Sequence, residues 1–499
     1  MAAVIGVDLG TSAVKVLLVD ETGATLATGS TAYPLQQPKP GYSEQDPEDW
    51  IRSVKAAIIA LGKKPEADLS QVAGLSFSGQ MHGLVLLSAA MRPLRPAILW
   101  NDTRTTAEVN QINQTMGKRF IEITRNRALE GFTLPKLLWV QKHEPENFAA
   151  AKMFLLPKDY VRYRMTGVAG IDYSDAAGTV MLDEDKRRWS PAILATFNIP
   201  ASLCPPLIEA TDCVGTLDPE FAAAVGLPKT VKVFGGGADN ACGAVGAGVL
   251  HPDQLLLSIG TSGVVLTYEP DSKTTYNGKL HYFDHVVPGQ HYSMGVTLAA
   301  GHSLNWFKKT FAPDEDFATL VASAAASRPG ANGLLFTPYL VGERTPYADA
   351  KIRGSFIGID SRQTRADFVR AVIEGITFSF RDVLAVYQDS GRTFKSAITI
   401  GGGSQSPLWL QIQADILNLK IVSLKNNQGP GIGAAMIAAV GLGWFASFEA
   451  CAKQFVEEKA TYVPDRKQVE RYTRYYKLYH DVYPATWPIT AGLLQTEES

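Results

Sequence analysis

A glycine-rich segment near the middle of the chain ends in a carboxylate that could take a proton from a substrate. The segment runs Phe234-Gly-Gly-Gly-Ala-Asp-Asn-Ala-Cys-Gly243 and follows an apolar, strand-like run. Its glycines permit a close approach between backbone and ligand, and Asp239 stands where a small-residue helix would begin. An exposed carboxylate at this point could act as a general base, but it could equally cap the helix. The local sequence leaves both roles open.

Two Gly-Thr-Ser turns could bind phosphate groups. One lies at residues 10–12 and the other at 260–262, and each stands between two strand-like runs, which predicts two hairpins. A tight glycine turn lets backbone N–H groups approach an anion. The hydroxyls of Thr11 and Ser12 in one turn, and of Thr261 in the other, would add donors. We expect the two turns to face each other across a cleft.

Charged residues beside the first turn could complete a phosphate site. Asp8 ends the preceding strand and could hold Mg²⁺ through water, because Mg²⁺ prefers a few carboxylates together with phosphate oxygens. Lys15 would bring positive charge to the same place. The chain has no G-x-x-x-x-G-K-[ST], G-x-G-x-x-G or H-E-x-x-H motif and no zinc-type cysteine spacing, so a nucleotide must be bound in another way. For Asp8 alone, a plain turn residue is the competing interpretation.

Two further loops could contact small ligands. Ser78-Gly-Gln-Met-His-Gly83 lies between two predicted strands and could present side chains and backbone to a polyol, although His82 alone also fits a surface histidine. Ile400-Gly-Gly-Gly-Ser-Gln-Ser406 follows a predicted strand and precedes a predicted helix at 408–417. Its glycines would let a flat adenine lie against the backbone.

These residues require two similar supporting units. Gly10 and Gly260 stand half a chain apart in a sequence of 499 residues, and matching strand-like runs flank both. This pattern predicts a diverged internal duplication, and strands that alternate with helical segments predict an α/β architecture. The small-residue stretch at 243–252 could serve as a hinge. We therefore expect domains at residues 1–247 and 248–499.

The composition excludes several classes of protein. Hydrophobic residues make up 46% and charged residues 19%, which argues against disorder. The formal net charge is −2 without a basic segment, so nucleic acid is not an expected partner. Four cysteines without C-x-x-C spacing predict a reduced, cytoplasmic protein, and the first residues do not fit a signal peptide. The apolar stretch at 431–445 is rich in Gly and Ala and predicts a buried helix rather than a membrane span.

Taken together, these residues resemble the FGGY carbohydrate kinases over essentially the whole chain. GFTLPKLLWVQKH at 131–143 fits the first signature of that family. GSFIGI at 354–359, followed by DFVRAVIEG at 367–375, fits the second. The resemblance implies two ribonuclease-H-like domains of the actin and sugar-kinase superfamily, with ATP and Mg²⁺ in a central inter-domain cleft that closes on substrate.

The resemblance also implies roles for individual residues. Family positions for the substrate correspond to Met81, His82, Asp239 and Asn240. Family positions for the nucleotide correspond to Thr11, Ser12, Gly260, Thr261, Gly301, Asn305, Gly402 and Ser406, to which we add Lys15.

Within the family, Gln80-Met-His-Gly83 and Trp100-Asn-Asp-Thr-Arg104 are similar to members that act on the ketopentose D-xylulose. Members that act on glycerol carry Arg-Glu in place of Met81-His82. The implied reaction is transfer of the γ-phosphate of ATP to the 5-hydroxyl of D-xylulose in xylose catabolism, with Asp239 as the general base and Asp8 orienting Mg²⁺.

Two alternatives remain. One is a kinase for ribulose, another ketose or a polyol. The other is a non-catalytic sugar or nucleotide sensor on the same fold, which the presence of both Asp8 and Asp239 disfavours. Neither nucleic acid nor a membrane is an expected partner, and the sequence leaves open whether the protein forms a homodimer.

Overall fold

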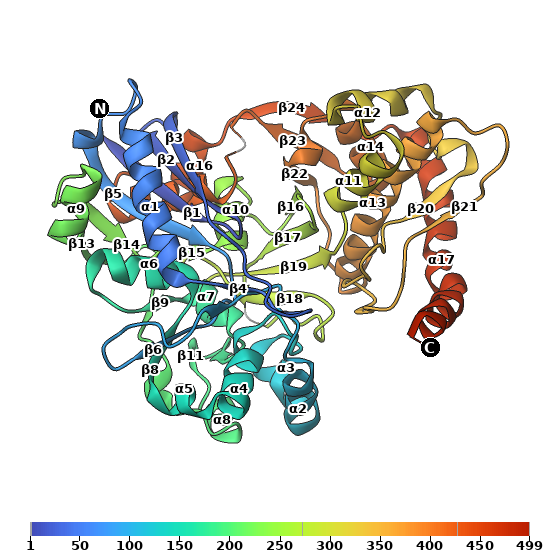
Figure 1. Ribbon diagram of the computed structural model, residues 1–499. Coiled ribbons are helices and arrows are strands. Elements are labelled where there is room, and N and C mark those ends of the chain that lie inside the picture. Colours follow the sequence, from blue (N-terminus) through green and yellow to red (C-terminus); the bar gives the residue numbers. More distant parts are fainter. Residues whose placement is uncertain (1, 272, 427, 499) are drawn as a thin grey trace.

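Two mixed β-sheets stand side by side, one in each half of the chain, in the computed structural model, which describes residues 2–271, 273–426 and 428–498 (Figure 1). In the first sheet the order is β13-β14-β5-β1-β2-β3, and β15 pairs with β5. In the second sheet the order is β18-β19-β17-β16-β22-β23-β24. The strands of the first sheet are β1 (Ala3–Leu9), β2 (Ala13–Asp20), β3 (Thr25–Ala32), β5 (Val72–Gly79), β13 (Cys213–Thr216), β14 (Lys232–Phe234) and β15 (Gly237–Ala238). Those of the second are β16 (Gln254–Ile259), β17 (Gly263–Glu269), β18 (His281–Asp284), β19 (His291–Thr297), β22 (Ser396–Gly401), β23 (Lys420–Leu424) and β24 (Glu458–Tyr462).

The two sheets repeat one topology. In the first, β1 pairs antiparallel with β2 and parallel with β5. In the second, β16 pairs antiparallel with β17 and parallel with β22. The core order β3-β2-β1-β5-β14 therefore matches β19-β17-β16-β22-β23. Both Gly-Thr-Ser turns connect the equivalent hairpins, so the predicted duplication is confirmed at the level of strand order.

Local sequence accounts for the elements that flank these hairpins. Strands β1 and β2 are apolar runs buried over most of their length, as expected of central strands. Helix α1 (Pro47–Gly62) begins where predicted: the Asp46 side chain accepts a hydrogen bond from the Glu48 backbone N–H, and Pro47 occupies the first turn.

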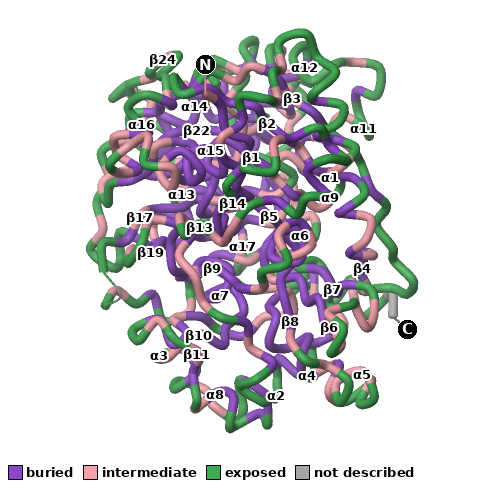
Figure 2. Tube along the Cα trace, turned by 90° about the vertical axis from the view of Figure 1, so that its left-hand side faces the viewer, coloured by how far each residue is buried: buried purple, intermediate pink, exposed green. Residues whose placement is uncertain are grey.

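Two small-residue helices pack against each other in the centre of the molecule. They are α10 (Asp239–Gly246) from the first half and α15 (Pro430–Gly441) from the second. A Cβ atom on Gly433 would lie 1.9 Å from the Cys242 carbonyl oxygen, and one on Gly6 would lie 2.1 Å from the Gly431 carbonyl oxygen. Only glycine permits such approaches. The buried helix predicted at 431–445 is confirmed up to Gly441, whereas residues 442–445 form a turn and are only partly buried. Figure 2 shows α15 among the buried central strands.

The second half of the chain returns to the first sheet. Helix α15 packs on β1, β2 and β5, although it follows β23 in sequence. Helix α16 (Phe448–Phe455) packs on α15 and, in Figure 1, stands next to the strands of the first sheet. The first residues of the predicted hinge, 243–246, belong to α10, so the connection between the sheets begins only after Gly246. A division at 247/248 separates the sheets and remains our proposal for the domain boundary.

The remaining elements form smaller layers around the two sheets. The two-stranded sheets are β4 (Glu44–Gln45) with β7 (Ala97–Ile98), β6 (Val85–Ser88) with β8 (Ala151–Leu155), β9 (Ile171–Asp172) with β12 (Leu207–Ile208), β10 (Leu182–Asp183) with β11 (Arg188–Trp189), and β20 (Leu335–Thr337) with β21 (Ser355–Ile357). The other helices are α2 (Thr106–Met116), α3 (Lys118–Thr124), α4 (Thr133–His143), α5 (Pro145–Ala150), α6 (Pro157–Thr166), α7 (Tyr173–Gly178), α8 (Pro191–Thr196), α9 (Pro219–Val225), α11 (Gly301–Phe311), α12 (Phe317–Ser323), α13 (Arg365–Asp389), α14 (Pro407–Leu417) and α17 (Arg466–Glu498). Within the described ranges, no helix is both long and apolar enough to cross a membrane.

Candidate active site

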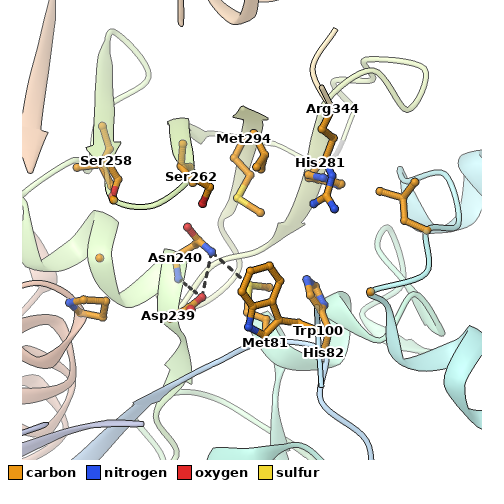
Figure 3. A pocket seen from close by; sticks show the side chains of 18 of the residues that line it. Met81, His82, Trp100, Asp239, Asn240, Ser258, Ser262, His281, Met294 and Arg344 are labelled. Carbon is orange, nitrogen blue, oxygen red and sulfur yellow. Dashed lines mark hydrogen bonds between the residues drawn. The ribbon is translucent and has the colours of Figure 1, made fainter. Parts of the chain in front are cut away.

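A cavity of about 280 Å³ lies between the two halves of the chain. Figure 3 shows the side chains that line it. They include Met81, His82, Trp100, Asp239 and Asn240 from the first half, and Ser258, Ser262, His281, Met294 and Arg344 from the second. All four residues that we assigned to the substrate therefore line one cavity.

Asp239 is the first residue of α10, but it does not cap that helix. The N-cap is Ala238, and no side chain caps it. Instead, Oδ1 of Asp239 accepts from the backbone N–H of Asn240 at 2.7 Å and from its side-chain amide at 2.9 Å. Burial, with a smaller contribution from the charge of Asp8, raises the pKa of Asp239 to about 7. A carboxyl group that titrates near neutrality is suited to accept a proton.

Asp8 ends β1 close enough to Asp239 for the two carboxylates to interact. Burial raises the pKa of Asp8 to about 6, although the nearby Ser78 hydroxyl and the charge of Lys15 oppose the shift. Lys15 is its cross-strand partner on β2, and the Lys15 ammonium donates to Oε1 of Gln428 at 2.6 Å. Two neighbouring carboxylates with raised pKa values form a site whose repulsion a divalent cation would relieve.

His82 presents a neutral imidazole to the cavity. Burial and the positive charge of Lys136 hold its pKa well below the usual range. Nδ1 lies 2.7 Å from the Gly178 carbonyl oxygen, so in the neutral ring the proton resides on Nδ1 and Nε2 is an acceptor. The backbone of His82 adopts a φ of 69°. Its carbonyl oxygen accepts from Lys136 Nζ at 2.9 Å and from the Thr133 hydroxyl at 3.0 Å, which hold the loop in place.

A second cavity, of about 720 Å³, lies beside the first and shares Gly260 with it. Six of the residues assigned to the nucleotide line it: Gly260, Thr261, Gly301, Asn305, Gly402 and Ser406. Local hydrogen bonds hold three of these residues in place. The Gly301 N–H donates to the Gly260 carbonyl oxygen at 2.8 Å, and Ser406 is the N-cap of α14. Apolar side chains such as Phe317 and Trp409 complete the wall.

Thr11 and Ser12 of the first turn do not line either cavity, and neither do Asp8 and Lys15 beside it. Thr11 Oγ1 accepts from Trp100 Nε1 at 2.9 Å, and Ser12 is exposed. Thr11 is therefore linked to the first cavity through Trp100, and a direct contact of either residue with phosphate remains a prediction.

The structure adds two residues that the sequence did not suggest, His281 on β18 and Arg344 in the loop between β20 and β21. Neither belongs to a glycine-rich or hairpin motif. Only the fold brings both side chains to the cavity. The sequence offers one weak signal, which is the charged Arg344 within the loop segment Gly-Glu-Arg-Thr-Pro.

Two α/β halves of one topology, with a carboxylate-lined cavity between them and a glycine-lined cavity beside it, define a two-domain kinase that phosphorylates a small molecule. Residues 3–246 match the model described as "FGGY family of carbohydrate kinases, N-terminal domain", and residues 255–442 match that of the C-terminal domain. The chain belongs to the FGGY family of carbohydrate kinases. Membership implies that it uses ATP and a sugar, together with a divalent metal.

Named relatives and solved structures resemble the chain over nearly its whole length. The xylulose kinase of Bacillus subtilis (strain 168) is 51% identical over 493 residues, which is 99% of each chain. The ligand-bound xylulose kinase of Lactobacillus acidophilus superposes with a TM-score of 0.93 at 27% identity, over 99% of this chain and 100% of the other. A gluconate kinase of the same organism gives 0.92 at 28% identity, over 97% and 98%.

Proposed function

We propose that the protein transfers the γ-phosphate of ATP to the 5-hydroxyl of D-xylulose. The observation that carries the proposal is Asp239, a carboxylate with a pKa near 7 in a cavity between the two halves. The name of the relative that is 51% identical supports xylulose as the sugar. A cavity of about 280 Å³ is just below the usual size of ligand pockets, roughly 300–1,000 Å³, and suits a five-carbon sugar better than a larger saccharide.

Asp239 takes the proton from the attacking hydroxyl. Asn240 occupies Oδ1 with two donors, which fixes the carboxylate and leaves Oδ2 for the substrate. The resulting oxygen attacks the γ-phosphorus in line, the bond from the γ-phosphorus to the β,γ-bridging oxygen breaks, ADP leaves, and the proton stays on Asp239. Because phosphoryl transfer needs little covalent help from the protein, positioning and charge neutralisation supply most of the acceleration.

The second cavity receives the nucleotide. Adenine would lie against the glycines of the turn at Gly402, between Phe317 and Trp409. Since Gly260 lines both cavities, the phosphates would pass the second Gly-Thr-Ser turn on the way to Asp239. Backbone N–H groups of that turn could then bind phosphate oxygens.

Asp8 would hold Mg²⁺, with Asp239 near by. The fit rests on two neighbouring carboxylates whose pKa values are raised to about 6 and about 7, because an oxygen-preferring cation favours their charged forms. When bound, Mg²⁺ would neutralise charge on the phosphates. Lys15 adds positive charge on the same side of β1 and β2.

Replacing the base tests the reaction. Asp239→Asn keeps the shape of the side chain but cannot accept the proton, so turnover on D-xylulose should fall roughly 10²–10⁴-fold. ADP release would be measured with D-xylulose, ribulose, other ketoses and polyols, with Asp212→Asn, an acid at the exposed edge of the first half, as the matched control. Near-normal turnover by Asp239→Asn would show that Asp239 is not the general base. A strong preference for another sugar would overturn D-xylulose as the substrate.

Assembly and location belong to the same proposal. We propose a cytoplasmic location. Whether the protein is a monomer or a homodimer would be decided by the mass measured by light scattering.

A further inference from the structure

Arg344 enters the sugar cavity from the second half of the chain and lies opposite His82 (Figure 3). Within the described part of the chain, no hydrogen bond or ion pair engages its guanidinium, and Glu130 and Glu343 favour its charge only from a longer range. Burial lowers the pKa of Arg344 without neutralising it. Arg344 is half-buried in the wall of the cavity, so its guanidinium N–H groups are available to a ligand there.

The backbone of the loop that carries Arg344 is held by hydrogen bonds on both sides of that residue. Thr345 exchanges two hydrogen bonds with Val296 of β19, at 3.0 and 3.1 Å. The Glu343 carboxylate accepts from the backbone N–H groups of Leu298 at 2.9 Å and of Arg344 itself at 2.7 Å. Such support is typical of a side chain that must meet a ligand in one geometry.

Arg344 stands at the opposite end of the cavity from the phosphate turn. In Figure 3, Ser258, Ser262 and Asp239 lie on one side, and His82, His281 and Arg344 lie on the other. A sugar that places its 5-hydroxyl on Asp239 therefore directs its C1 and C2 atoms toward Arg344 and His82.

We propose that Arg344 recognises the α-hydroxyketone end of the sugar. Its N–H groups donate to the C2 carbonyl oxygen, while Nε2 of His82 accepts from the neighbouring hydroxyl. This proposal rests on the proposed function and names the group by which the cavity distinguishes a ketose from a polyol. A polyol carries a tetrahedral hydroxyl at C2: its oxygen can still accept from the guanidinium, but it lies out of the plane of a carbonyl and its own proton finds no acceptor on Arg344.

A sugar acid is the competing occupant of the same end, because a guanidinium also binds carboxylate. Two features favour the ketone. Glu130 already offsets part of the charge of Arg344. In addition, Nε2 of His82 carries a lone pair, which a carboxylate would repel and a hydroxyl would satisfy.

The test compares sugars that differ only at C2. Wild-type protein, Arg344→Gln and Arg344→Lys would be assayed for ADP release with D-xylulose and with xylitol, and the binding of both sugars would be followed by the fluorescence of Trp100 in the cavity. Arg344→Gln should raise KM and Kd for D-xylulose roughly 10–100-fold with a smaller change in kcat, since a donor to the substrate is lost. Its effect on xylitol should be several-fold at most, so the preference for the ketose shrinks. Arg344→Lys should lie between the two, because it keeps the charge but loses the planar fork.

The control is Arg353→Gln, an arginine of the same segment that bonds to backbone carbonyls and does not line the cavity. It should leave both sugars unchanged. Equal losses with D-xylulose and xylitol, or no loss with D-xylulose, would overturn recognition of the carbonyl. Tighter wild-type binding of D-xylonate than of D-xylulose, abolished in Arg344→Gln, would instead assign a carboxylate to this end. Wild-type protein that turns over no D-xylulose would refute the proposed function and is thereby distinguished from a failure of Arg344 alone.

Discussion

At the scale of single residues, the site depends on carboxylates held in an environment that disfavours their charge. Asp239 titrates near pH 7 and Asp8 near pH 6, and each pKa is raised chiefly by burial. The sequence identified both residues but could not decide between catalysis and capping for Asp239. The structure places Ala238, not Asp239, at the N-cap of α10, and Asp239 accepts from one backbone N–H of the first turn through Oδ1.

The raised pKa values predict the pH dependence of the reaction. Asp239 must be deprotonated to act as a base, so kcat/KM for D-xylulose should fall about tenfold per pH unit below about pH 7. If Asp8 must also be charged, the slope should steepen below about pH 6. The titration of His82 should not change the slope of the pH profile, since the pKa of His82 lies well below its usual range. Measurements with saturating Mg-ATP between about pH 5.5 and about pH 8.5 would check this, and a flat profile would contradict it.

The raised pKa of Asp239 also predicts that this carboxylate lowers the stability of the folded protein. The pKa of Asp239 is about 7 when folded and 3.8 in a model peptide, so its contribution to folding is lost as pH rises from about 4 to about 7. Well above pH 7 the cost is complete, on the order of 4 kcal/mol at about 1.4 kcal/mol per pKa unit. Asp239→Asn should therefore raise the melting temperature at pH 8 and raise it less at pH 5. A variant less stable than wild type at pH 8 would show that the carboxylate is stabilised by contacts instead.

At the scale of elements, the sequence predicted what local patterns determine. The β-branched runs around Gly10 and Gly260 gave the two hairpins, and Asp46-Pro-Glu-Asp gave the start of α1. The sequence missed Arg344 and His281 because contacts between β18, β19 and a distant loop bring them to the cavity. Six nucleotide positions inferred from resemblance line one cavity, whereas Thr11 and Ser12 do not.

The crossing of α10 and α15 makes a prediction about glycine. Gly433→Ala would place a methyl group 1.9 Å from the Cys242 carbonyl oxygen, so the two helices must separate. We expect a loss of about 1–3 kcal/mol of unfolding free energy. Gly492→Ala on α17, where nothing lies within 4 Å of the added carbon, is the matched control. It should gain up to about 1 kcal/mol through helix propensity. Denaturant unfolding of both variants would measure the difference, and equal stabilities would mean that α15 can shift at no cost.

At the scale of the whole molecule, the two halves cannot be separated at the sequence boundary between them. The face of the first sheet that bears Val4, Leu17 and Val19 is covered by apolar residues of α15, among them Ile432, Ala435 and Met436. In the sequence, α15 begins almost two hundred residues after the connection that joins the two sheets. The sequence predicted that this helix is buried. It could not predict which sheet the helix covers, because the pattern of apolar residues does not identify the element that packs against it.

Because α15 and α16 of the second half pack beside the first sheet, the behaviour of fragments of the chain can be predicted. A fragment of residues 1–247 lacks α15 and α16 and would expose the apolar face of β1, β2 and β5, so it should aggregate. Joining residues 429–457 to its C-terminus through a flexible Gly/Ser linker should restore a soluble unit, because it returns both helices to that face. Size-exclusion chromatography and thermal unfolding would compare the two, with a linker of equal length but no helix as the control. A monomeric fragment of residues 1–247 that unfolds cooperatively by itself would show that α15 is dispensable to the first sheet. In that case its glycine contacts serve the junction between the halves rather than the core of either.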